Sequence, residues 1–168
     1  MLAAAARRTG HYSLAQQLYG DSVALSGEVG RLGMIPTEHH NLGYVALHEG
    51  DINGAELLFR RALTEARQYK ATFIFPYLIL DFGVLALARG DLLKAATLVV
   101  AADARFEALG IALDPDDAAE CEAVGETTGR RARRPAEVRG TAKRPRCAWP
   151  CESTHWWPPK VPALDRLT

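Results

Sequence analysis

The sequence has few of the features that mark an exported, membrane-spanning or disulfide-rich chain. Its 168 residues contain three cysteines, Cys121, Cys147 and Cys151, and an odd count without an export signal argues against a disulfide scaffold. No apolar run reaches the ~18 residues that a membrane span needs. Residues 1–10 lack the charged and then apolar layout of a secretory signal. We therefore expect a cytoplasmic chain that makes no membrane contact.

Catalytic patterns are also lacking. The sequence shows no nucleophile paired with a base and no glycine-rich loop that would hold a phosphate. The carboxylates of Asp114, Asp116 and Asp117 fit the start of a helix and need no chemistry. We expect neither an enzyme nor a cofactor.

What the sequence does have is a repeat. Gly10, Gly50 and Gly90 lie 40 residues apart, and a similar phrase follows each of them. Self-similarity at such a period is typical of stacked helical arrays. The matched positions are separated by three, one and three residues, which keeps them on one helical face. They are Ala15, Ala55 and Ala95; Leu18, Leu58 and Leu98; Tyr19, Phe59 and Val99; and Ser22, Ala62 and Ala102.

The other half of each period is helical as well. Pro36 and Pro76 suit the first turn of a helix, where a missing N–H costs nothing. Gly43 and Gly83 share one repeat position inside these helices, which suggests close helix–helix approach. Gly50 and Gly90 should end the helices, and an aspartate follows each glycine as the expected N-cap of the next helix.

This unit of helix, Gly-Asp turn and helix resembles the tetratricopeptide repeat. The chain departs from that family in its period of 40 rather than about 34 residues, in Ala46 and Ala86 at an aromatic position, and in lacking the closing proline. Repeats of this length are similar to those at the C-terminal end of bacterial signalling ATPases and LuxR-type, MalT-like transcription regulators. The resemblance rests on Leu42, Gly43, Gly50, Ala55, Phe59 and Ala62, and on Phe82, Gly83, Gly90, Ala95, Val99 and Ala102.

We therefore predict an all-α fold, an antiparallel helix-pair solenoid over residues 1–125 whose first repeat is truncated. Helices are expected over 1–8, 13–29, 36–49, 51–69, 76–89 and 91–109. Thr72 to Phe75 should form a first helical turn or a packed link rather than a strand. A short helix from Pro115 to about Val124, capped by Asp114, should cover the apolar edge of the last pair. Apolar surface near Leu2 and Leu14 should stay exposed and favour self-association.

Residues 126–168 differ in character. They hold 10 Lys/Arg and 4 Asp/Glu, whereas residues 1–125 hold 10 and 16. Arginine clusters, six of the nine prolines and all three tryptophans lie here, so we predict a disordered basic tail. An altered reading frame would give similar text. Binding of nucleic acid through this tail is the alternative function. Cys147, Cys151 and His155 are zinc-ligand types, but structural zinc needs a fourth ligand, so no metal site is expected.

The resemblance implies a binding groove on the first helices of the pairs, suited to a protein or peptide ligand. We expect His40 and His48 to be solvated there, roughly 12 Å apart by helix rise and too distant to share one metal ion. His39 should point elsewhere. The expected function is a protein–protein interaction scaffold, a fragment of or derived from the sensor region of a larger bacterial regulator. The groove positions are Thr37, His40, Tyr44, Leu47 and His48, with Tyr77, Leu80, Val84, Leu87 and Ala88.

Overall fold

The computed structural model describes residues 2–113 and 115–128, all within the first of two units of the chain, Met1–Ala132. Every regular element in this part is helical, so the predicted all-α class is confirmed. The predicted tail, and with it the cysteine–histidine cluster, lies outside the described residues. The α-helices are α1 (Leu2–Arg8), α2 (Tyr12–Glu28), α3 (Ile35–His48), α4 (Ile52–Gln68), α5 (Phe75–Ala88), α6 (Leu92–Leu109) and α7 (Pro115–Thr127).

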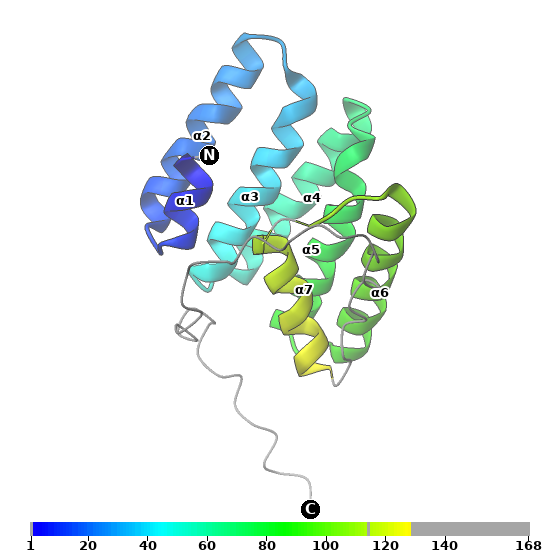
Figure 1. Ribbon diagram of the computed structural model, residues 1–168. Coiled ribbons are helices and arrows are strands. Elements are labelled where there is room, and N and C mark those ends of the chain that lie inside the picture. The colour runs from blue at the N-terminus through cyan, green and yellow to red at the C-terminus, as the bar shows by residue number, and fades with distance from the viewer. Residues whose placement is uncertain (1, 114, 129–168) are drawn as a thin grey trace, which may run out of the picture. The chain divides into compact units, whose positions relative to one another are not determined.

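Consecutive helices pack against one another in pairs, joined by short turns (Figure 1). The most extensive contacts join α3 to α4 and α5 to α6, and α4 also packs on α5, so the second pair lies beside the first. A 3₁₀ turn precedes α3 at Leu32–Met34 and another precedes α5 at Thr72–Ile74. The segment before Pro76 is thus a helical link, as expected, because no described strand is present for it to pair with.

The turns are built as the repeat predicts. Asp51 and Asp91 cap α4 and α6, each accepting a hydrogen bond from a backbone N–H three residues ahead, at 2.8 and 3.1 Å. Gly50 and Gly90 have φ of 83° and 79°, a left-handed conformation that side chains disfavour. Lys70 takes the corresponding role after α4 with φ of 55°, and it is the only described non-glycine residue with positive φ.

The repeat positions form the core. Ala15, Ala55 and Ala95 have no exposed surface, and a Cβ on Gly43 would overlap the ring of Phe59. The glycine therefore allows α3 and α4 to approach closely, which confirms the interpretation from sequence. On the N-terminal side, Leu2 is 77% exposed and Leu14 is 49% exposed, as expected. Self-association stays a prediction.

The last helix differs from expectation in its length and partners. α7 continues to Thr127, past the predicted end near Val124 and past the expected domain boundary at residue 125. It packs on α6 as a cover of the last pair would, but it packs equally on α5 (Figure 1). Two acidic side chains of α7 also reach the histidines of α3. The helix therefore lies over the first helices of the pairs, where the groove was predicted.

Candidate functional site

The predicted groove residues converge, but they do not line an open groove. His40, Tyr44, Leu47, Leu80, Val84 and Leu87 are all at most 8% exposed, while Thr37, His48, Tyr77 and Ala88 are half-buried. Most of them share one apolar cluster with Cys121 and Val124 of α7. The expectation of solvated histidines is therefore wrong, because α7 covers the surface that the repeat pattern leaves open.

His40 is the centre of this covered surface. Its Nδ1 donates a hydrogen bond to Oδ2 of Asp81 on α5 at 2.8 Å. Its Nε2 lies 3.9 Å from Oδ1 of Asp117 on α7. The imidazole thus bridges a carboxylate of the core and a carboxylate of the covering helix. The rings of Tyr44 and Tyr77 pack edge-on against it, with centroids 5.3 and 5.9 Å away.

His48 makes a second contact with α7, two helical turns along α3. Its Nε2 lies 3.8 Å from Oε1 of Glu120, and its ring stacks on that of Tyr12 with centroids 5.6 Å apart. The guanidinium of Arg7, a residue that is only 7% exposed, lies 5.3 Å from the centroid of the Tyr44 ring. α1 therefore adds a buried cation to the surface formed by α3 and α5.

The pKa values of the two histidines are shifted in opposite directions. Burial opposes the protonation of His40, but the charge of Asp81, the hydrogen bond to it and the charge of Asp117 together raise the pKa of His40 above 6.5. Burial, together with the charge of Arg7, lowers the pKa of His48 to about 4. The surface therefore favours the protonated form of His40 and the neutral form of His48, and the Arg7 guanidinium adds a positive charge.

Tyr44 and Asp81 complete the buried cluster. Burial raises the pKa of the Tyr44 phenol, and the charge of Asp81 raises it further. Burial also raises the pKa of Asp81, against the stabilising effect of His40. The Tyr44 hydroxyl and Oδ1 of Asp81 are buried without a hydrogen bond of good geometry, although the two groups interact electrostatically. The polar groups of this cluster therefore interact with one another and are shielded from water.

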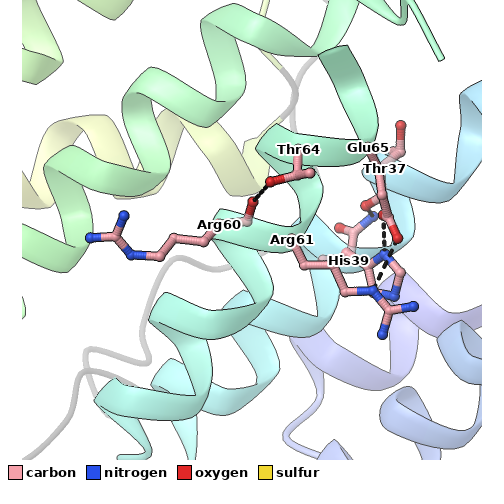
Figure 2. A network of polar contacts seen from close by, with 7 residues as sticks. Thr37, His39, Arg60, Arg61, Thr64 and Glu65 are labelled. Atoms are coloured by element: carbon pink, nitrogen blue, oxygen red, sulfur yellow. Dashed lines mark hydrogen bonds and ion pairs between the residues drawn. The ribbon is translucent and has the colours of Figure 1, made fainter. Parts of the chain in front are cut away.

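His39 belongs to a different surface, as predicted. Its Nδ1 lies 2.6 Å from Oε2 of Glu65 on α4, and Arg61 donates to the other oxygen of Glu65 at 3.0 Å (Figure 2). Burial outweighs the influence of Glu65 and lowers the pKa of His39. This contact joins α3 to its own partner helix and does not involve α7.

Sequence reasoning missed four members of the site: Arg7, Asp81, Asp117 and Glu120. Asp81 carried a signal, since it is the only charged residue in the otherwise apolar helix α5. Asp117 was interpreted as part of a helix start, but it is only 4% exposed and faces His40. Nothing in the repeat marked Arg7 or Glu120.

The arrangement can bind carboxylates. The imidazoles of His40 and His48 lie near the acids of α7. The guanidinium of Arg7 lies over the ring of Tyr44, which stands between these two histidines in the sequence of α3. No water-exposed nucleophile lies among these residues. Within residues 2–113 and 115–128, no three histidine, cysteine or acidic side chains are placed to hold a metal ion. None of the described helices is long and apolar enough to cross a membrane.

Comparisons with protein-family models, curated proteins and solved structures found no match for this chain. The interpretation of the site therefore rests on its own geometry.

Proposed function

We propose that this chain is a protein-interaction scaffold, a tetratricopeptide-like array that binds a helical segment on the face formed by α3 and α5. One observation carries the proposal: a helix already occupies that face. α7 packs on α5 and α6, and its acidic side chains lie 3.9 and 3.8 Å from His40 and His48. A surface that accepts one helix in this way has the shape and chemistry to accept another.

The resemblance to the repeats of bacterial regulators supports a role in signalling. In such proteins the array receives a signal and controls an ATPase and a DNA-binding module. We propose the same type of role here: the array binds the partner protein, and any ATPase or DNA-binding step belongs to other modules. The alternative, nucleic-acid binding through residues 126–168, rests on residues outside the described part of the chain.

Selection of peptides tests the proposal without assuming a partner. A displayed library of helical peptides is selected against the full chain, and each enriched peptide is added to ¹⁵N-labelled protein. Amide shifts should concentrate in residues 37–48 and 77–88, and a scrambled peptide of equal composition should leave them unchanged. Shifts confined to α2 and α4, or to residues 126–168, would contradict the proposal. Binding of RNA or DNA alone, lost on deletion of residues 129–168, would favour the alternative.

A further inference from the structure

We propose that the natural ligand of this face is an acidic helical segment of another protein. α7 is then an internal competitor for the same seat, by which we mean the surface of α3 and α5 that α7 covers. This inference rests on the proposed function and names the class of partner. It is carried by the charges of the face, by the pattern of α7 and by the residues of the neighbouring repeat.

The pattern that α7 presents is simple. Its four buried side chains with described surroundings are Asp117, Glu120, Cys121 and Val124, at i, i+3, i+4 and i+7. These positions form one stripe of a helix. The seat is thus matched to two carboxylates one turn apart, followed by two small apolar side chains. A partner helix with the same pattern would place the same groups against α3 and α5.

The charges of the face favour such a ligand. His40 and Asp81 form a hydrogen-bonded pair that carries no net charge as a unit, and the guanidinium of Arg7 adds one positive charge beside it. The face therefore keeps a surplus of one positive charge among these groups, and α7 supplies two carboxylates to it. Charge complementarity of this kind selects partners of one sign and disfavours basic or neutral helices.

The next repeat shows that the fold does not need these polar residues. The positions 40 residues after His40, Tyr44 and His48 are Leu80, Val84 and Ala88, all apolar. Apolar side chains therefore suffice at these positions of a first helix. Polar side chains at the same positions of α3 fit recognition of a polar ligand better than they fit packing.

α7 brings few apolar side chains to this surface. Among its described residues, Cys121 and Val124 are the two that belong to the apolar core cluster. Burial, with the charge of Asp103 whose carboxylate oxygen lies 3.8 Å from the sulfur, raises the pKa of the Cys121 thiol and keeps it protonated. A helix with larger apolar side chains at these two positions can compete for this place.

The test uses the full chain with α7 released. Val124→Asp puts a charge into the apolar seat, and Ala118→Asp adds the same charge on the exposed side of α7 as the matched control. The probe is a fluorescein-labelled peptide of residues 113–128 with Cys121→Ser, compared with its Asp117→Asn, Glu120→Gln form. We expect V124D to bind the native-sequence acidic peptide at least tenfold more tightly than the doubly substituted one, which keeps the other acids, and at least tenfold more tightly than A118D binds it.

A second pair of variants tests the face itself. In the V124D chain, Arg7→Gln should weaken binding of the acidic peptide at least fivefold. Arg8→Gln, which removes an equal charge from the exposed neighbouring residue, should leave it within twofold. Equal losses in the two variants would mean that charge acts only at long range, and the proposed seat would be wrong.

A measurement on intact α7 decides the matter if V124D does not fold. In a chain with Cys147→Ser and Cys151→Ser, excess acidic peptide should speed alkylation of Cys121 at least fivefold by displacing α7, and the Asp117→Asn, Glu120→Gln peptide should not. If both peptides act equally, the seat is a peptide site without acidic preference, so the partner class is wrong while the proposed function stands. If neither peptide acts here or binds folded V124D, α7 is a fixed part of the fold and the inference is overturned.

Discussion

Gly43 and Gly83 occupy the same position of the repeat, yet replacing each by alanine should change stability in opposite directions. An ideal Cβ on Gly43 would lie 2.3 and 2.6 Å from two ring carbons of Phe59. On Gly83 the nearest atom would be a methyl carbon of Val99 at 3.1 Å, with two further atoms at 3.4 and 3.5 Å. The first contact is an overlap that requires movement, and the second is a tight fit.

The Phe59 ring has little room to move. Its residue has no exposed surface, and the rings of Tyr44 and Phe82 contact it with centroids 5.5 and 6.4 Å away. Overpacking a core costs about 1–3 kcal/mol, and an overlap of this size should reach the upper end. Alanine regains about 1 kcal/mol of helix propensity over glycine. Gly43→Ala should therefore lose about 2 kcal/mol, and Gly83→Ala should range from neutral to about 1 kcal/mol more stable.

Urea unfolding followed by circular dichroism measures both changes. The Phe59→Leu variant is a useful second background, because a smaller side chain should relieve the overlap and reduce the cost of Gly43→Ala by about 1 kcal/mol or more. If Gly43→Ala is as stable as Gly83→Ala, or if Phe59→Leu leaves its cost unchanged, the packing of α3 on α4 described above is wrong.

Two further outcomes follow from the covered surface. The pKa of His48 is lowered from 6.5 to about 4, so the unfolded chain binds the proton first and stability should fall by about 2–3 kcal/mol as the pH falls through that range, after allowance for partial exposure. His48→Gln should flatten this part of the profile of unfolding free energy against pH, measured by urea unfolding, and an unchanged slope in H48Q would refute the lowered pKa of His48. His40 has a raised pKa, so its contribution to the stability of the fold should be lost as the pH rises through its folded-state pKa. Burial, with the charge of Asp103, raises the pKa of Cys121 to about 12, so in a chain whose other cysteines are serine, iodoacetamide at pH 8 should react with it at least tenfold faster in urea than in buffer; equal rates would show that the thiol is already accessible.

The helices could be predicted from the sequence because every level of the repeat agrees. Pro36 and Pro76 mark helix starts, Asp51 and Asp91 provide caps, and the glycine turns supply the left-handed residues. Lys70 shows the limit of this reasoning. Gly30 and Gly110 stand at the matching positions of the other repeats, with φ of 71° and 64°, and Lys70 keeps the same left-handed conformation with φ of 55°. The turn therefore persists without a glycine at this position.

The sequence could not predict that the groove is covered, because the covering helix α7 lies outside the repeat. Periodicity assigns residues to faces within each pair, and it placed His40 and His48 correctly on the first helix. It says nothing about where a final, unmatched helix will dock. α7 has only a weak apolar stripe, so its acids suggested a solvated helix start. The burial of Asp117 and Glu120 becomes evident only once the structure shows that these two side chains lie against His40 and His48 of α3.

The buried pair of His40 and Asp81 serves to orient the imidazole more than to stabilise the fold. A buried ion pair recovers little of the cost of removing both charges from water, and apolar replacements are often at least as stable. The repeat shows that the fold needs neither charge, since the counterpart of His40 in the next repeat is Leu80 and the counterpart of Asp81 in the preceding repeat is the uncharged Asn41. What the pair does supply is a fixed orientation. With Nδ1 held by Asp81, Nε2 of His40 is directed at the carboxylate of the covering helix. The core carboxylate thus acts as a positioning group for the histidine, and the histidine determines which kind of helix the surface can hold.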